Sequence, residues 1–328
     1  MALIIDRMPL TNKGDEPLTL AFEGRKQWLE IRKKYIGASE SATLLGYGMF
    51  SSPYALYMEK TNQAPDTFTD NTRMAWGRRL EASIRDGIAE DLGYDPQDCL
   101  YGDEIYVYKE GPERLGCTPD AVFAYPNHRV HIALGDVQGP GCFEVKNVDG
   151  IIHKQKWTED EPPVQYLTQL QHQLAVTGYE WGVLGALVGG NKPMTYFYRR
   201  HEPTIQAIKS AALAFWKAVD QGKPPAIDDS QATEKTIKAM HPRDNGADLD
   251  LSADNELPQV CADFLAKKKA YRELDKEIRG LKSQIMEKLG DARTADVLNF
   301  SIKAPTTEVE GYWVEARTQR TLTVKEKK

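Results

Sequence analysis

The chain has 328 residues, and its 42 Lys and Arg against 48 Asp and Glu give a formal net charge of −6. Hydrophobic residues make up 41% and charged residues 27%, which is typical of a globular enzyme or binding protein with a sizeable core, in one large domain or two ordinary ones. The charge excludes a uniformly basic DNA coat, but a local basic groove on an acidic protein is compatible with it. No apolar run approaches the roughly 18 residues of a membrane span, so we expect no membrane association.

The N-terminus and the cysteines indicate the compartment. Residues 1–17 lack a basic start followed by a long apolar stretch, so we expect no secretion signal. The four cysteines, Cys99, Cys117, Cys142 and Cys261, form no CxxC pair. We therefore expect free thiols, a cytoplasmic location and no zinc site.

Composition and periodicity divide the chain into four segments. Residues 1–24 are weakly periodic and predict a loosely ordered lead-in, whereas residues 25–222 carry the elements of one domain. Residues 223–250 predict a linker that is briefly helical at 233–240. Residues 251–328 predict a C-terminal extension.

Hydrophobic periodicity within the domain predicts alternating helices and strands. The residues after Trp28 predict a short helix, a turn at Gly37 and a second helix with Ser39 near its start. A longer helix is expected at 72–92, ended by Gly93. The remaining expected elements are strands at 104–108, 121–124 and 142–146, a helix at 164–177, strands at 182–188 and 194–199, and a covering helix at 203–220. This order predicts the α/β or α+β fold class.

The C-terminal extension combines a long amphipathic pattern with a strand-like one. Apolar residues from Leu257 to Leu289 recur in alternating steps of three and four, interrupted at Lys267, which predicts an amphipathic helix of coiled-coil type. Residues 297–303 and 312–324 then alternate like the two strands of a β-hairpin. Two roles are open for the helix: packing on the preceding domain, or binding a partner or a further copy.

The most informative chemical pattern lies on two neighbouring strands. Asp120 follows a proline just before one strand, and Glu144 and Lys146 lie two residues apart on the next, so both side chains leave the same face. Two carboxylates suit Mg²⁺, which prefers oxygen ligands, and the Val145 carbonyl can add another ligand. The metal would lower the pKa of bound water, and Lys146 would orient or deprotonate that water. An exposed edge strand would give the same pattern without any activity.

Further polar residues on the helices could join such a site. Glu81 lies near the inward-facing stripe of helix 72–92, and Tyr166, Gln169 and Gln173 share one face of the later helix. The alternatives are a position at the margin of the stripe for Glu81 and a solvated polar face for the glutamines.

Arg32 and Ser39 surround an expected helix start. Backbone N–H groups, a hydroxyl and a guanidinium at such a place can bind a phosphate. Ser39 could equally be an ordinary N-cap, and Arg32 could form a salt bridge with a neighbouring helix.

Five sequence motifs together resemble a known family. They are residues 28–32 with 36–40, 76–81, 118–120, 144–146, and 166–171. In this order they are similar to the YqaJ-like viral recombinase family, which includes phage lambda exonuclease and belongs to the PD-(D/E)xK nuclease superfamily. The resemblance covers about residues 28–221. It implies a restriction-endonuclease-like core, with a mixed central sheet flanked by helices, for residues 25–222.

The resemblance also assigns roles at the metal centre. It implies that Asp120, Glu144 and Glu81 hold up to two Mg²⁺ ions, for which Mn²⁺ would substitute. It implies that Lys146 is the catalytic lysine. Together with the Val145 carbonyl, these residues form the expected catalytic and metal-binding set.

Four more residues receive roles from the resemblance. Tyr166 and Gln169 are implied to lie beside the active centre, and Arg32 and Ser39 to bind the 5′-phosphate of the DNA end. Ala121 departs from the family pattern, because many relatives have glycine after the Pro-Asp pair. The extension from about residue 246 is a larger departure, because lambda exonuclease lacks it.

The family implies a phage-type exonuclease that digests linear double-stranded DNA from 5′ ends. The 3′ single strands would pass to a phage annealing protein in the bacterial cytoplasm, and the enzyme would be a homo-oligomeric ring. One alternative is a structure-specific endonuclease or nickase on the same fold. The other is a largely non-catalytic DNA-binding or recruiting module.

Overall fold

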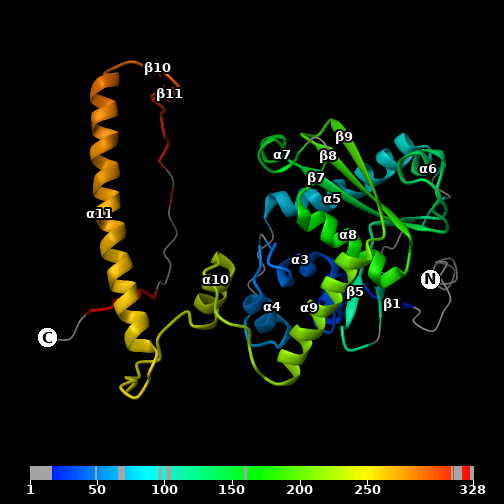
Figure 1. The fold of residues 1–328 in the computed structure, drawn as a ribbon, viewed down its shortest axis with the longest axis horizontal. Helices are drawn as coiled ribbons and strands as arrows, with labels where there is room; N and C mark the ends of the chain where they lie inside the picture. Colours follow the sequence, from blue (N-terminus) through cyan, green and yellow to red (C-terminus); the bar gives the residue numbers. More distant parts are fainter. Residues whose placement is uncertain are drawn as a thin grey trace. The chain divides into compact units, whose positions relative to one another are not determined.

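The computed structural model describes residues 17–48, 50–65, 71–95, 98–100, 105–109, 111–158, 161–311, 313 and 320–325 (Figure 1). The chain divides into two compact units, Met1–Met240 and His241–Lys328. No helix in the described part of the chain is long and apolar enough to cross a membrane.

The first unit is built on a mixed five-stranded sheet in the order β3-β6-β7-β8-β9. Its strands are β3 (Cys99–Leu100), β6 (Ala121–Phe123), β7 (Gly141–Val148), β8 (Trp181–Val188) and β9 (Lys192–Arg199). β7 and β8 run parallel, from Gly141 opposite Trp181 to Val148 opposite Val188, whereas the other neighbouring strands are antiparallel. The predicted fold class, with a mixed central sheet flanked by helices, is confirmed.

Nine helices and one 3-10 turn, η1, are described in this unit. They are α2 (Gly24–Arg32), η1 (Ala38–Glu40), α3 (Ser41–Leu44), α4 (Pro53–Lys60), α5 (Thr72–Leu92), α6 (His128–Leu134), α7 (Gly150–Lys156), α8 (Val164–Thr177), α9 (Glu202–Asp220) and α10 (Gln231–Met240). α5 and α8 end before Gly93 and Gly178, as the sequence predicts. Three helices of eight residues or fewer were not predicted: α4, α6 and α7.

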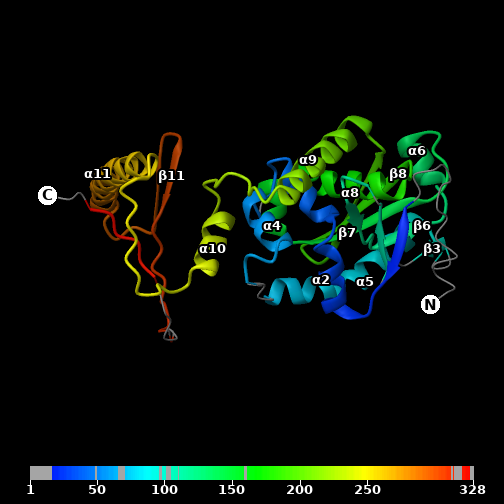
Figure 2. The ribbon, with the colours of Figure 1, turned by 90° about the horizontal axis from the view of Figure 1, so that it is seen from below.

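Helices cover both faces of the central sheet, with α5 on one face and α8, backed by α9, on the other (Figure 2). Two glycines of β8 permit this close approach. A Cβ atom at Gly182 would lie 2.8 Å from Leu170 Cδ1 of α8, and one at Gly185 would lie 3.0 Å from Ile88 Cδ1 of α5. Because side chains alternate along a strand, each glycine clears one face.

A smaller four-stranded sheet has the order β1-β4-β5-β2. Its strands are β1 (Leu18–Ala21), β4 (Ile105–Tyr108), β5 (Leu115–Cys117) and β2 (Ile36–Gly37). Only β4 was predicted, and Glu104, its expected first residue, lies outside the described residues. β1 falls in the weakly periodic N-terminal segment, and β2 occupies the expected turn at Gly37. Strands of two to four residues are too short to show periodicity, which explains these differences.

A buried histidine joins α8 to the smaller sheet and to α3. His172 Nε2 donates to the carbonyl oxygen of Gly116 at 3.0 Å, and Nδ1 bonds the Ser41 hydroxyl. A carbonyl can only accept, so the proton is on Nε2 and Nδ1 accepts from Ser41 in the neutral ring. Burial lowers the pKa of His172 from 6.5 to about 4.

This buried ring predicts a pH dependence of stability. Between pH 6.5 and pH 4, His172 binds a proton in the unfolded chain but not in the folded one, so stability decreases as the pH falls. We expect His172 to contribute a slope approaching about 1.4 kcal/mol per pH unit in this window. Denaturant unfolding at several pH values should show a smaller slope for His172→Gln. An unchanged slope would contradict the neutral buried ring.

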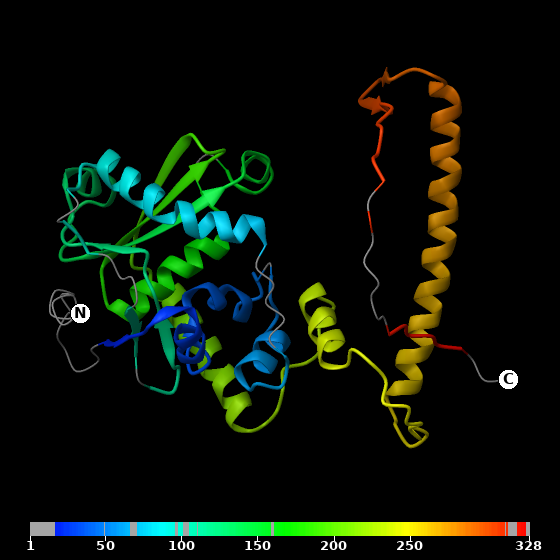
Figure 3. The ribbon, with the colours of Figure 1, turned by 180° about the vertical axis from the view of Figure 1, so that it is seen from behind.

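The second unit contains the long helix α11 and a hairpin after its C-terminal end (Figure 3). The elements are α11 (Leu257–Leu289), β10 (Thr294–Val297) and β11 (Phe300–Lys303). α11 confirms the predicted amphipathic helix. The predicted hairpin was wrong in its pairing, because Val297 lies opposite Phe300 within the segment expected to be a single strand.

The reason for the wrong pairing is the loop between these strands. Leu298 and Asn299 connect them without the glycine that usually marks a two-residue hairpin loop. Of the expected second strand at 312–324, residues 313 and 320–324 are not in a strand, and the others lie outside the described residues.

Candidate active site

Asp120 lies directly before β6, at the N-terminal end of that strand. The pairing of β6 with β7 ends at Ala121 opposite Phe143, so one further step along the register places Asp120 next to Glu144. The free backbone N–H of Val145 donates to Asp120 Oδ2 at 2.7 Å. N–H and C=O of one strand residue point to the same side, so the Val145 carbonyl also leaves β7 toward Asp120. The predicted neighbours Asp120, Glu144 and Val145 therefore meet at this strand end.

Glu144 is a nearly buried carboxylate, with 2% of its surface exposed. Its Oε1 accepts from Lys146 Nζ and, at 2.5 Å, from Gln169 Nε2, while Oε2 accepts from Gln173 Nε2 at 2.6 Å. β7 lies inside the sheet, so the alternative of an exposed edge strand is wrong. Glu144 and Lys146 do leave the same face, as their spacing predicts.

Gln173 is a functional candidate that the predicted site set omitted. It is fully buried, which excludes a solvated polar face at this position. Its Oε1 has no hydrogen-bond partner among the described residues. The signal was its position on one helix face with Tyr166 and Gln169, but helix spacing alone does not distinguish a buried face from a solvated one.

The charges at this site interact strongly. Burial raises the pKa of Asp120 well above its ordinary range, and the negative charges of Glu144 and Glu81 raise it further, against the effect of Lys146. Burial opposes the charge of Lys146, but Glu144 and Asp120 outweigh burial and raise the Lys146 pKa. Lys146 is therefore an ammonium at neutral pH, with its Nζ 5.5 Å from the ring centre of Tyr166.

The described residues contain no group of three or more His, Cys, Asp or Glu side chains that could hold a metal ion. Both Glu144 oxygens accept hydrogen bonds from Lys146, Gln169 and Gln173. Asp120 and Glu144 nevertheless form a pair of oxygen donors whose charges repel each other, and a cation would relieve this repulsion. A bound divalent ion would thus replace part of the hydrogen bonding around Glu144.

Arg32 and Ser39 come together around Glu40, which the predicted site set omitted. Arg32 Nη2 donates to Glu40 Oε1 at 2.7 Å and lies 3.5 Å from Ser39 Oγ. The Gly37 N–H donates to Glu40 Oε2 at 2.7 Å, so Glu40 folds back over its own turn. The alternative of a salt bridge for Arg32 is therefore present, but it does not exclude phosphate binding. The Arg32 side chain is 21% exposed, and Ser39 is exposed.

Lys60 completes this cluster from α4. Its ammonium is fully buried and lies 2.7 Å from Glu40 Oε2. It also donates to the carbonyl oxygens of Arg32 and Tyr35, at 2.7 and 2.8 Å. Burial disfavours the Glu40 carboxylate, but the charges of Lys60 and Arg32 outweigh burial and lower the Glu40 pKa to about 2. The charges of Arg32, Lys60 and Glu40 sum to one positive charge, and the exposed carboxylate of Glu59 also interacts with both cations.

Trp28 connects this cluster to the strand that leads to Asp120. The Arg32 guanidinium lies over the indole ring, 4.5 Å from its centre. The indole Nε1 donates to Thr118 Oγ1 at 3.3 Å, and Thr118 lies two residues before Asp120. The cluster and the carboxylates are therefore linked through one short segment.

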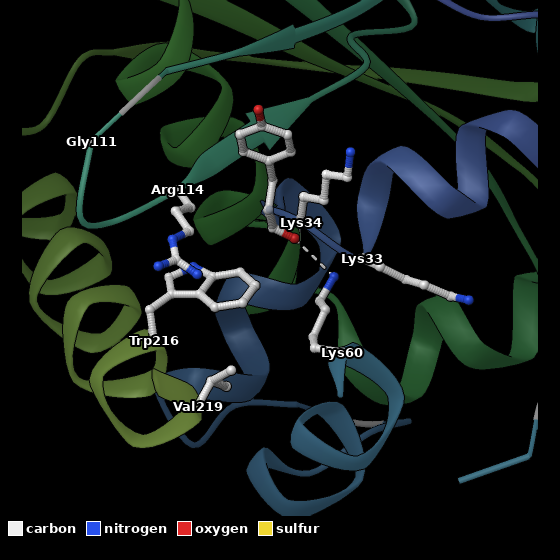
Figure 4. A pocket seen from close by; sticks show the side chains of 8 residues that line it. Lys33, Lys34, Lys60, Gly111, Arg114, Trp216 and Val219 are labelled. Carbon is white, nitrogen blue, oxygen red and sulfur yellow. Dashed lines mark hydrogen bonds between the residues drawn. The ribbon is translucent and has the colours of Figure 1, made fainter. Parts of the chain in front are cut away.

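A groove of about 470 Å³ opens beside Lys60 (Figure 4). Its walls are formed by Lys33, Lys34, Tyr35, Lys60, Gly111, Arg114, Trp216 and Val219. Arg114 lies over the Trp216 ring, 4.8 Å from its centre, and its Nη2 donates to both carboxylate oxygens of Asp220 at 3.1 Å. The Trp216 Nε1 is buried and has no acceptor among the described residues. The groove thus has a basic lining.

The comparison with protein families agrees with the order of the motifs. Residues 27–180 match the family described as YqaJ-like viral recombinase domain. The chain contains a YqaJ-like viral recombinase domain. It is also 28% identical over 299 residues to the uncharacterized protein YqaJ of Bacillus subtilis (strain 168), which covers 89% of this chain and 86% of that protein.

Solved structures were found at lower similarity. The alkaline exonuclease LHK-Exo from Laribacter hongkongensis is 18% identical, with a TM-score of 0.45, over 60% of this chain and 94% of that one. Its complex with dAMP gives the same identity and coverage, with a TM-score of 0.44. All predicted site residues of this chain, from Arg32 to Gln169, lie within the YqaJ-like domain, whereas Trp216 of the basic groove lies beyond it.

The buried Glu40 gives a stability prediction for the YqaJ-like domain. Glu40→Gln would leave the buried Lys60 ammonium without its counter-charge, so we expect a loss of about 3 kcal/mol in the free energy of unfolding. Glu30→Gln is the control, because Glu30 pairs with Lys33 at the surface and its loss should cost less than about 1 kcal/mol. Denaturant unfolding at pH 7 measures both, and equal losses would contradict the buried pair.

Proposed function

We propose that the chain is a metal-dependent deoxyribonuclease of the phage recombination type, with residues 25–222 as its nuclease domain. The observation that carries this proposal is the meeting of Asp120, at the N-terminal end of β6, with Glu144 and Lys146 of β7 inside the sheet. A buried carboxylate (Glu144), a half-buried one (Asp120) and an ammonium on one face can bind a divalent cation and a phosphodiester together. The match to a viral recombinase domain supports the same class of activity.

The donor set fits Mg²⁺, and Mn²⁺ as its substitute, because the available ligands are oxygens. Asp120 and Glu144 would hold the ion, with the Val145 carbonyl as a third ligand and Glu81 as a further carboxylate for up to two ions. A bound divalent ion would lower the pKa of a water molecule and neutralise negative charge on the phosphate.

The protein residues around this site would position the reacting groups. The Lys146 ammonium stabilises negative charge on the phosphate and orients the attacking water, in a setting where low exposure strengthens its field. Gln169 and Gln173 fix the Glu144 carboxylate through their amide groups. The Tyr166 ring packs beside Lys146 and limits where the ammonium can lie.

Replacement of Lys146 should abolish cleavage. We expect Lys146→Ala to lose at least about 100-fold in rate on linear duplex DNA with Mg²⁺, because it removes the positive charge next to the scissile phosphate. DNA binding should persist. Lys235→Ala, which changes an exposed lysine of α10, is the matched control.

The same assay in EDTA tests the metal. Wild-type activity should vanish in EDTA and return with added Mg²⁺. Near-wild-type turnover of Lys146→Ala would contradict its role, and activity that survives EDTA would contradict metal dependence. No cleavage under any condition would favour a non-catalytic DNA-binding module.

For the mode of action, we propose digestion of linear duplex DNA from 5′ ends, which leaves 3′ single strands for an annealing protein. The support is the pair of Arg32 and Ser39, which lie close together and partly exposed at the surface. Trp28, which contacts the Arg32 guanidinium, links this pair to Thr118 in the segment before Asp120. A guanidinium and a hydroxyl suit a terminal phosphate monoester. The basic groove beside Lys60 would bind the phosphates of the DNA backbone.

The state of the DNA end provides the test. Wild type should degrade duplex with a 5′-phosphate faster than the same duplex with a 5′-hydroxyl, because a terminal phosphate carries about −1.5 to −2 charges. Arg32→Lys keeps the charge but removes the two-pronged guanidinium, so it should slow only the phosphorylated substrate. Gel assays at two salt concentrations measure both rates, and unfolding curves show that the variant is folded.

Two outcomes would overturn this mode. Equal rates of wild type on both ends would remove the proposed end recognition. Cleavage of covalently closed circular duplex would show an endonuclease or nickase, because an exonuclease leaves that substrate intact.

A further inference from the structure

α11 presents an uncovered apolar stripe to solvent. The exposed fractions of its side chains run from 37% for Leu257 and Phe264 to 71% for Tyr271. The stripe consists of Leu257, Val260, Phe264, Tyr271, Leu274, Ile278, Leu281 and Ile285. A helix of 33 residues with this much exposed apolar surface on one side is expected to bury it against a partner.

The spacing of the stripe fits one heptad assignment. Its steps of three and four place Leu257, Phe264, Tyr271, Ile278 and Ile285 at the a positions. The d positions are Val260, Lys267, Leu274, Leu281 and Lys288. The second half of the stripe combines Ile at a with Leu at d, which favours two parallel strands.

The charges beside the stripe are complementary between two copies of the helix. In a parallel, in-register pair, each g residue faces the e residue five positions later on the other helix. Asp263 then faces Lys268, and Glu277 faces Lys282. The other three pairs are Glu256 with Cys261, Ala270 with Asp275, and Gln284 with Leu289. Two pairs are therefore attractive in each direction and none is repulsive.

We propose that α11 forms a parallel, two-stranded coiled coil with the α11 of a second copy of this chain. The apolar stripe supplies the buried seam, and the Asp263–Lys268 and Glu277–Lys282 pairs set direction and register. Lys267 interrupts the seam at a d position. Such a polar residue reduces stability but helps to fix register and the number of strands. This inference is independent of the proposed nuclease activity.

Cysteine cross-linking of the full chain tests the geometry. In a Cys261→Ser background, Leu274→Cys places a thiol in the seam, so two copies should form an interchain disulfide when oxidised glutathione is added. Lys276→Cys is the control, because position f lies on the opposite side of the helix. Cross-linking of most chains at position 274 and of few at 276 supports the coiled coil. Equal cross-linking at both positions, or none at 274, overturns it, the latter being expected if α11 packs on the first unit or on another protein.

Charge reversal tests direction and register in the same Leu274→Cys chain. Glu277→Lys alone and Lys282→Glu alone should each weaken the pairing about tenfold, because two attractive pairs become repulsive. The double variant Glu277→Lys with Lys282→Glu should restore cross-linking. A mixture of the two single variants should cross-link mainly between unlike chains. Failure of both rescues would overturn the parallel, in-register pairing even if the chain self-associates elsewhere.

Discussion

The arrangement of the first unit depends on the burial of one carboxylate, Glu144, in the middle of a sheet. A buried carboxylate is very unfavourable unless charged and hydrogen-bonding partners surround it. β7 supplies Lys146 from two residues away, and α8 supplies the amides of Gln169 and Gln173. α8 must therefore lie directly against β7. The packing of this helix and the hydrogen bonding of the Glu144 carboxylate thus depend on each other.

Glu40 is a second buried carboxylate that is stabilised by charged partners. There a buried lysine from α4 and an arginine from α2 surround the carboxylate, and the low pKa of Glu40 shows that attraction outweighs burial. The surroundings of Glu144 and Glu40 differ in the charge of the ion that they suit. Around Glu144, the carboxylates repel each other and suit a cation, whereas beside Glu40, the partly exposed guanidinium of Arg32 suits an anion. A phosphodiester chain with a bound cation matches both centres.

Local sequence patterns were enough to predict the long elements and the residues of β7. Because Glu144 and Lys146 lie two residues apart on a strand, the sequence alone predicts that their side chains share one face. The helices α5, α8 and α11 are long enough to show a clear periodicity of apolar residues. A helix face and a helix start pointed to Glu81 and Arg32 but left a structural alternative open for each, and the resemblance to the family gave them the roles that stay predictions.

The missed features depend on contacts between distant segments. Lys60 lies twenty residues from Glu40 and belongs to an eight-residue helix, so nothing local marks it as a buried ion. His172 is fixed by a carbonyl and a hydroxyl from two other elements. The strands β1 and β2 exist because neighbours pair with them, not because of their own composition.

The two glycines of β8 affect how close α5 and α8 lie to the sheet at the candidate site. Gly182 and Gly185 make the sheet thin where α8 and α5 cross it, and these helices carry Gln169 on one side and Glu81 on the other. The distance of each helix from the sheet, and with it the positions of Gln169 and Glu81 relative to Glu144, therefore depends on two residues that have no side chain. A methyl group added at either position would crowd a side chain of the facing helix, Leu170 of α8 or Ile88 of α5, and that side chain or its helix would have to shift.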